Sequence, residues 1–291
     1  MADVGSSVPR RQLGRYLKQA REQAGRSLES VARDLEWSRA RMYRIERGEA
    51  PLRKHEVETM CRLYEVRQAT TDVLIGLAAE AKSKGWWHSY GDAVPAWFEL
   101  FVSMEAAATS LRQYEANLIS GLLQIPEYAD AAVRIEPHLS DAEVERRVAL
   151  RLERQKILTR RAPRPPVLDV IIAEQVLRQS IKNRDAWQRQ LAHLSNVARP
   201  PMLSVRVLPA SVGPHAASVA GTFTLLDFDR DAKPAEPTTV YCENVTGALY
   251  LEKPAETQAY EKIWAALCEA ALSVEQTQDL ITQLIKETFD D

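Results

Sequence analysis

Arginine is concentrated in one short segment of the chain. Arg39, Arg41, Arg44 and Arg47 lie within nine residues of one another, together with Tyr43. A guanidinium group can bond both acceptors on a guanine edge, and each good pair gives about 1–3 kcal/mol of discrimination against other bases. The residue types of this segment therefore predict contacts to nucleic-acid bases and phosphates.

The charge around this segment favours the same chemistry. Between Arg10 and Lys54 there are thirteen Lys and Arg residues and six Asp and Glu residues, a formal charge of +7, whereas the whole chain carries -2. A compact basic segment is typical of a phosphate-binding surface, although a basic face that is merely solvated has the same composition. The rest of the chain is acidic.

Two short helices must position the arginines. Ser27 and Ser38 are good N-cap residues, and each precedes apolar residues at helical spacing. The second helix, about Arg39–Arg47, turns Met42 and Ile45 inward. Its outward residues are Arg39, Ala40, Tyr43 and Arg44, with Arg41 and Arg47 toward the edges of that face. This is the helix-turn-helix design, in which the second helix enters the major groove and the two helix N-termini suit phosphate contacts.

Residues 13–66 resemble the lambda-repressor/Cro-like (XRE-type) helix-turn-helix family, which has five helices. The run S-R-A-R-M-Y-R-I-E-R-G-E, residues 38–49, carries the resemblance. It implies base contacts by Arg39, Ala40, Tyr43 and Arg44, and phosphate contacts by Ser27, Arg47 and Arg53. The helix N-terminus at Ser38 and the edge position of Arg41 add these two residues to the predicted phosphate contacts. The resemblance also implies that Arg21 and Glu46 brace the first helix against the third. Leu28 stands where the family often has a DNA-contacting Gln, so we expect that contact to be absent.

The remainder of the chain predicts a mixed domain. An apolar helical tract over 97–114 and a charged helix from Ser140 to about Arg161 precede a Pro-rich stop. Short β-rich segments then follow over 167–172, 203–208, 222–228, 239–243 and 249–252, and two helices close the chain. We therefore predict a mainly α protein with an α+β C-terminal domain, in which a small mixed or antiparallel sheet is flanked by helices.

Residues from about 84 onward resemble the C-terminal domain of actinobacterial Scr1-type, toxin–antitoxin-like transcriptional regulators. The resemblance rests on G-W-W at 85–87, G-L-L-Q-I-P-E-Y-A at 121–129, A-E-Q-V-L-R at 173–178 and E-N-V-T-G at 243–247. It implies a partner encoded by an adjacent gene. We expect a disordered N-terminus over 1–9, a DNA-binding domain over 10–83 and a regulatory, dimerisation or partner-binding domain over 84–291.

Aromatic residues gather at the expected domain junction. They are Trp86, Trp87, Tyr90, Trp97 and Phe98. Such a cluster is usually packing between elements, and the alternative is a groove for a partner or ligand, since aromatic side chains anchor interfaces. The charged helix that begins at Ser140 allows two interpretations as well, a solvated face or a dimer seam.

Catalytic patterns are weak in this sequence. It contains no zinc-binding His spacing, nucleophile elbow, P-loop or dinucleotide fingerprint. Ser211, His215 and Asp227 have the residue types of a catalytic triad, but any chain of this length contains such a combination. The carboxylates Glu115, Glu174 and Glu243 are candidates for a polar site, with Gln124 beside Glu115, or else structural acids. We expect no enzyme activity, cofactor or metal.

The bulk composition narrows the class of protein. Hydrophobic residues make up 45% and charged residues 27% of the 291, as in soluble globular proteins. The start of the chain lacks the apolar core of a signal peptide, no stretch is long enough to span a bilayer, and three scattered cysteines suit a reducing compartment. We expect a cytoplasmic, nucleoid-associated protein without membrane contact.

Two functions fit these observations. The first is a sequence-specific transcriptional regulator that binds double-stranded DNA as a homodimer, and whose C-terminal domain receives a signal from a small protein or ligand. The second is an antitoxin-like protein that sequesters a neighbour-encoded small protein and uses DNA binding for autoregulation.

Overall fold

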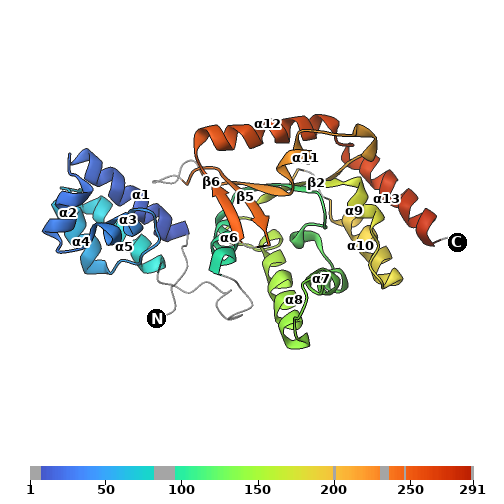
Figure 1. Ribbon diagram of the computed structural model, residues 1–291, viewed down its shortest axis with the longest axis horizontal. Coiled ribbons are helices and arrows are strands. Elements are labelled where there is room, and N and C mark those ends of the chain that lie inside the picture. Colours follow the sequence, from blue (N-terminus) through green and yellow to red (C-terminus); the bar gives the residue numbers. More distant parts are fainter. Residues whose placement is uncertain (1–7, 82–95, 199–200, 230–235, 246, 290–291) are drawn as a thin grey trace. The chain divides into compact units, whose positions relative to one another are not determined.

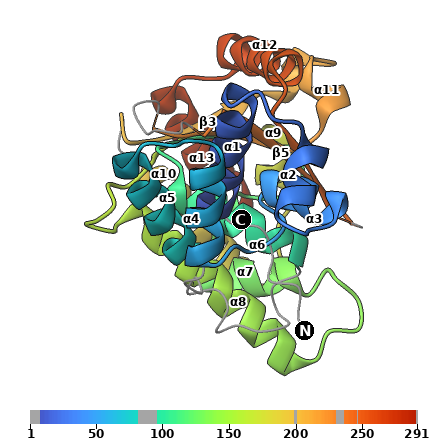
Figure 2. The ribbon, with the colours of Figure 1, turned by 90° about the vertical axis from the view of Figure 1, so that its left-hand side faces the viewer.

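The computed structural model describes residues 8–81, 96–198, 201–229, 236–245 and 247–289. The chain divides into two compact units (Figures 1 and 2). The first unit comprises residues 1–107 with 229–236, and the second comprises 108–228 with 237–291. The expected boundary at residue 84 lies outside the described residues.

The first unit contains six helices among its described residues. They are α1 (Val8–Gln23), α2 (Leu28–Asp34), α3 (Arg39–Glu46), α4 (Lys54–Leu63), α5 (Gln68–Glu80) and α6 (Ala96–Ala107). One apolar side chain from each of the first five meets in the core, where Leu17, Val31, Met42, Val57 and Leu74 are fully buried. The predicted five-helix N-terminal domain is therefore confirmed.

The second unit is built on a six-stranded mixed sheet of order β3-β2-β1-β4-β5-β6. The strands are β1 (Ser110–Glu115), β2 (Val167–Ala173), β3 (Leu203–Leu208), β4 (Phe223–Asp227), β5 (Thr239–Asn244) and β6 (Gly247–Leu251). β1, β2 and β3 run parallel, and β4, β5 and β6 continue the sheet as antiparallel neighbours. The predicted α+β domain is confirmed.

Helices flank the sheet of the second unit. They are α7 (Pro126–Val133), α8 (Asp141–Gln155), α9 (Glu174–Arg178), α10 (Arg184–Val197), α11 (Ala217–Ala220), α12 (Pro254–Ala270) and α13 (Val274–Phe289), with 3₁₀ turns η2 (Gly121–Leu123), η3 (Lys156–Leu158) and η4 (Ala210–Val212). α12 lies over one face, and α7 and α8 lie on the other side (Figures 1 and 2). The turn η2 is joined to β1 by a buried hydrogen bond, in which Ser120 Oγ donates to Gln113 Oε1 over 2.6 Å.

The predicted helix over 97–114 is wrong in its second half. α6 ends at Ala107, and Ser110–Glu115 forms β1, a central strand between β2 and β4. Leu111 and Tyr114 have helical spacing, which predicts a helix. In the structure this segment pairs with β2 on one side and β4 on the other, so it is a strand buried within the sheet. The strands that pair with this segment, β2 and β4, lie more than fifty residues further along the chain, so local spacing does not predict the pairing.

Two predicted helix ends also differ. α1 begins at Val8, so Val8 and Pro9, which we expected to be disordered, are helical, because Pro is well suited to a first turn. Residues 1–7 lie outside the described residues. α8 ends at Gln155 instead of Arg161, and the chain continues as the 3₁₀ turn η3. The side-chain amide of Gln155 donates to the carbonyl oxygens of Gly121 and Gln124, at 3.0 and 2.7 Å.

Gly48 fixes the end of α3. Its φ is +71°, and the amides of Gly48 and Glu49 donate to the carbonyls of Ile45 and Arg44, a Schellman motif. A Cβ added at Gly48 would lie 2.6 Å from the Cα of Arg11. The position therefore requires glycine for both its φ and its contact with α1.

Replacing this glycine should destabilise the first unit. A left-handed alanine costs about 1–2 kcal/mol, and Gly48→Ala adds a clash with backbone, so it should lower the free energy of unfolding by clearly more than that. Gly25→Ala is the matched control, since Gly25 has a φ of +64° and nothing within 4 Å of an added Cβ. Urea unfolding measures both, and equal losses would contradict the close approach.

Candidate nucleic-acid interface

α3 presents one polar face to solvent. Ser38 caps the helix, because its Oγ accepts from the amide of Arg41 over 3.1 Å, and Met42 and Ile45 are buried in the core. Four of the predicted base-contacting positions are exposed, namely Arg39, Ala40, Tyr43 and Arg44. Capping and burial together therefore fix which side of α3 can approach a ligand.

The two arginines predicted to read bases are weakly held. Arg39 Nε lies 2.9 Å from Glu29 Oε1 of α2, but the two side chains are 76% and 51% exposed. Such an exposed pair contributes little and is easily exchanged for another partner. Arg44 makes no side-chain hydrogen bond or ion pair to any residue that the structure describes. Both guanidinium groups are available to an external acceptor.

Tyr43 and Arg47 form a small exposed group with Glu49. Arg47 donates from Nε to Glu49 Oε1 over 2.5 Å and from Nη1 to the Tyr43 hydroxyl over 3.2 Å. The Arg47 guanidinium also lies 5.4 Å from the centre of the Tyr43 ring. These contacts raise the pKa of Arg47, chiefly through the hydrogen bond to Glu49. Tyr43 therefore contacts Arg47 on the outer face of α3 and remains 53% exposed.

Arg21 and Glu46 join α1 to the end of α3. Arg21 donates from Nε to Glu46 Oε1 over 2.6 Å and from Nη2 to Glu46 Oε2 over 3.0 Å. Their side chains are only 9% and 6% exposed. Arg21 Nη1 also donates to the carbonyl of Arg26 over 2.8 Å. The hydrogen bond to Glu46 is the main cause of a raised Arg21 pKa. A bidentate pair of this kind sets the orientation of α3.

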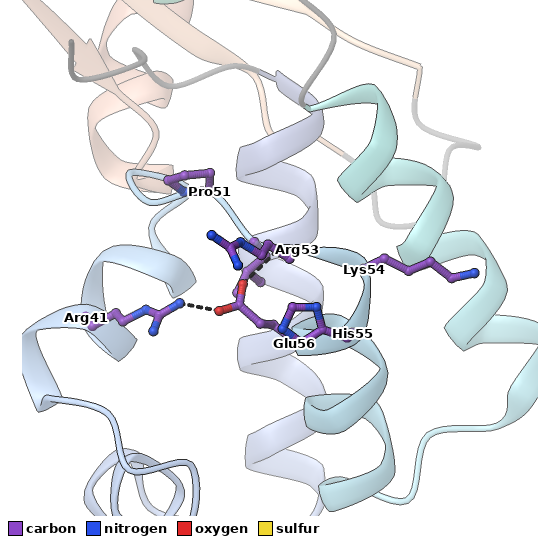
Figure 3. Close-up of a pocket in the computed structure, with 7 residues that line it drawn as sticks. Arg41, Pro51, Arg53, Lys54, His55 and Glu56 are labelled. Carbon is purple, nitrogen blue, oxygen red and sulfur yellow. Dashed lines mark hydrogen bonds and ion pairs between the residues drawn. The ribbon is translucent and has the colours of Figure 1, made fainter. Parts of the chain in front are cut away.

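A hollow lies beside the start of α3, at the N-terminus of α4 (Figure 3). Its lining includes Arg41, Arg53, Lys54, His55 and Glu56. Arg41 Nη2 donates to Glu56 Oε1 over 2.5 Å, and Glu56 Oε2 accepts from the amide of Arg53 over 2.7 Å. Arg53, Lys54 and His55 are exposed around the helix N-terminus, where backbone amides favour anions.

The predicted phosphate contacts are not equivalent. Arg41 is bound to Glu56, and its guanidinium lies 3.9 Å from the centre of the Trp37 ring. It therefore positions α4, and its charge is shared with a carboxylate. Ser27 Oγ, like that of Ser38, accepts a capping bond, in this case from the amide of Ser30 over 3.0 Å. Both serines mark first turns with amides directed outward.

Sequence reasoning missed two residues of this region. Lys54 and His55 line the hollow beside the predicted Arg53. The signal that could have found them is a run of three basic-type residues at the start of a helix after Pro51.

The predicted aromatic groove falls mostly outside the described residues. This applies to Trp86, Trp87 and Tyr90. Trp97 lies on α6, and Phe98 of the same helix has its ring centre 5.4 Å from that of Phe101. The described contacts of Phe98 are therefore those of a packed helix.

The candidate triad of Ser211, His215 and Asp227 is not assembled in the second unit. Asp227 bonds Arg112 and Thr238, at 2.9 and 2.7 Å, while His215 Nε2 lies 3.4 Å from the Tyr114 hydroxyl. Glu174 accepts from the amide of Ala210 over 2.8 Å and pairs with a neighbouring arginine of α9, which is a structural role.

The two other candidate carboxylates lie together. Glu115 and Glu243 approach each other closely enough for their charges to interact. Within the described part of the chain there is no group of three or more His, Cys, Asp or Glu that could hold a metal ion. Nor is any described helix long and apolar enough to cross a membrane.

Comparisons with protein families match both parts of the chain. A model described as "Domain of unknown function (DUF5753)" matches residues 98–283, and a model described as "Helix-turn-helix domain" matches residues 12–74. The chain belongs to the DUF5753 family. Its helix-turn-helix match covers the capped helices and the exposed arginines described above, and it indicates DNA binding and a role as a transcriptional regulator. No curated protein and no solved structure matches the chain.

Breaking the buried pair should destabilise the helix-turn-helix domain of this DUF5753 protein. Glu46→Leu leaves the Arg21 guanidinium buried without its carboxylate, which costs about 3–5 kcal/mol. The double variant Arg21→Met with Glu46→Leu should recover most of the loss, because no uncompensated charge remains. Urea unfolding measures the loss, and hydrogen exchange over 8–81 localises it. A loss below about 1 kcal/mol for Glu46→Leu would contradict this bracing role.

Proposed function

We propose that this protein is a sequence-specific transcriptional regulator that reads operator DNA with α3. The observation that carries the proposal is the exposed set Arg39, Ala40, Tyr43 and Arg44 on a helix whose opposite side is buried. An α-helix fits the major groove, where the side chains of such a face reach base edges. Arg39 and Arg44 read guanine, and Tyr43 contacts base or sugar beside them.

Phosphate contacts in our proposal frame this base-reading face. Arg47, Arg53, Lys54 and His55 supply cationic or hydrogen-bonding side chains, and the first turns after Ser27 and Ser38 supply backbone amides. These contacts fix the register of the protein on the duplex but carry no sequence information. Arg41 has a bracing role, because Glu56 already neutralises part of its charge.

We further propose that the protein acts as a cytoplasmic, nucleoid-associated homodimer with no enzyme activity. A single recognition helix covers only a half-site, and two-fold symmetry doubles the contact. The DUF5753 domain then supplies dimerisation and the response to a signal, in keeping with its resemblance to Scr1-type regulators. α8 offers part of a seam through Val148 and Leu152, which are half-buried, whereas Val144 is buried within the second unit.

A second candidate function is that of an antitoxin-like protein that binds a small protein encoded by an adjacent gene. It is favoured by β6, the last strand of the sheet, beside which Val245 and Leu249 are 98% and 61% exposed. Edge strands with exposed apolar residues are sites of chain pairing. A stoichiometric small partner recovered from the native host, one that changes operator binding, would support this second function.

The first test is removal of the two base-reading arginines. Full-length protein is used to select operator sequences from a random DNA pool, and gel-shift titration then measures affinity. Arg39→Ala with Arg44→Ala should abolish preference for the selected site while the circular dichroism spectrum stays native. Arg146→Ala, an exposed arginine of α8, is the control and should bind like the unmodified protein. Unchanged affinity of the double variant would disprove the assignment.

The second test concerns symmetry. A homodimer should give a solution mass of twice 32.8 kDa. The selected operators should then be inverted repeats whose half-site centres are about 34–36 Å apart, or a multiple of that distance. Light scattering and the selected sequences provide both measurements. A monomer that binds an asymmetric site with the same affinity would contradict this arrangement.

A further inference from the structure

The second unit carries a polar group on an otherwise apolar face of its sheet. Gln113 of β1 aligns with Thr224 of β4, which aligns with Tyr241 of β5, so these side chains share one face. Side chains alternate along a strand, so Glu115 and Glu243, each two residues further on, lie on the same face. Because β4 is antiparallel to both strands, β1 and β5 run in the same direction and end at the same edge.

α8 brings two arginines to these carboxylates. Arg151 and Arg154 are three residues apart and therefore share one side of the helix. That side meets η2, since a Cβ added at Gly121 would lie 3.6 Å from Arg154 Nη1 and 3.8 Å from Arg151 Cγ. We call Glu115, Glu243, Arg151 and Arg154 the sheet-edge cluster.

η2 and the chain after it hold the arginine side in place. Arg151 Nη1 donates to Gln124 Oε1 over 3.1 Å, and Gln124 Nε2 donates to the carbonyl of Ile119 over 2.6 Å. Gln155 donates to the carbonyl of Gln124 over 2.7 Å. The Arg151 side chain is therefore held by the side-chain amide of Gln124, and Gln124 is itself held by hydrogen bonds.

The charges of the sheet-edge cluster do not cancel in the usual way. Arg151 makes its hydrogen bond to a neutral amide, and the described residues include no ion-pair partner for it. Burial, and then the nearby Arg154, lower the pKa of Arg151 to about 10, so it stays charged at neutral pH. A desolvated cation is normally matched by a carboxylate in direct contact. Glu243 and Glu115 act on Arg151 through their charge, but neither forms an ion pair with it among the described contacts.

Glu115 has an unused carboxyl group. Its side chain makes no hydrogen bond or ion pair within the described parts of the chain. Burial first, and then Glu243, raise its pKa to about 8, against the opposing effect of Arg154 and Arg151. Glu115 is therefore a neutral hydrogen-bond donor at pH 7. Glu243, by contrast, accepts from the Tyr241 hydroxyl over 2.9 Å and remains exposed.

We propose that the sheet-edge cluster binds a small carboxylic acid that carries a hydroxyl or amino group near its carboxylate. The Arg151 guanidinium matches the carboxylate in a two-bond geometry, and neutral Glu115 donates to the same group. Glu243 accepts from the hydroxyl or amino group. A phosphate dianion fits less well, because it would face the carboxylates of the cluster. The inference rests on the proposed function only in treating this ligand as the effector.

The experiment is calorimetric titration of full-length protein with L-lactate in the absence of DNA. We expect saturable binding that Arg151→Met removes and that Arg146→Met, a matched change at an exposed site of the same helix, leaves intact. Acetate, which lacks the hydroxyl group, should bind at least several-fold more weakly. No saturable lactate signal, equal binding by Arg151→Met, or tighter binding of inorganic phosphate would each overturn the proposal.

A pH series provides a readout that survives if Arg151→Met fails to fold. Glu115 loses its proton as the pH rises through about 8, and the new negative charge repels the bound carboxylate. Lactate affinity should therefore fall about tenfold between pH 7 and pH 9. Glu115→Gln mimics the neutral carboxyl group and should remove this dependence. A persistent pH dependence in Glu115→Gln would overturn the role of Glu115.

Several other charged or titratable side chains face Glu115. They are Glu243 and Tyr241 of β5, Arg151 and Arg154 of α8, and Tyr128 of α7. Burial raises the pKa of Tyr128 and of Tyr241, so both phenols stay neutral between pH 7 and pH 9. The variant Arg39→Ala with Arg44→Ala should bind lactate normally, which separates a failure of this inference from a failure of DNA binding.

Discussion

The bidentate pair between Arg21 and Glu46 orients α3, and the proposed DNA-reading surface depends on that orientation. α3 has only eight residues and one polar face, so its own hydrogen bonds cannot fix its direction. The pair is buried, and it ties the last turn of α3 to α1, so that removing one partner leaves an uncompensated buried charge. The close approach of Gly48 to α1 then leaves little freedom for rotation. In the proposed function this rigidity serves recognition, because bidentate contacts to base edges require a fixed direction of the side chains.

The outer face of α3 shows how charge is distributed between folding and recognition. Arg21 and Arg41 are committed to Glu46 and Glu56 and serve the fold. Arg39 and Arg44 are exposed and weakly held, and these two carry recognition in the proposed function. The same residue type therefore has opposite roles according to burial, which sequence alone does not display.

In the second unit, strand register decides which polar side chains lie together. The strand register places Gln113, Thr224 and Tyr241, with Glu115 and Glu243 beyond them, on one face of its sheet. On the opposite face, Arg112 pairs with Asp227 and Arg206 pairs with Asp169. Glu115 and Arg151 are each half-buried, and neither forms an ion pair with any residue that the structure describes. Native proteins retain such arrangements where a ligand or a switch uses them. For the DUF5753 domain, the question is therefore which ligand Glu115 and Arg151 bind.

The amino-acid sequence predicts the helix-turn-helix domain, the polar face of α3 and the α+β class of the second unit. These follow from local rules, since caps, glycine stops and apolar periodicity act within a few residues. The tertiary structure alone decided that Ser110–Glu115 is a central strand, because its partners β2 and β4 lie far along the chain. It also decided that Arg41 braces α4 and that Glu115, Glu243 and Arg151 meet. Long-range pairing sets those contacts, and no local pattern encodes which residues will face one another.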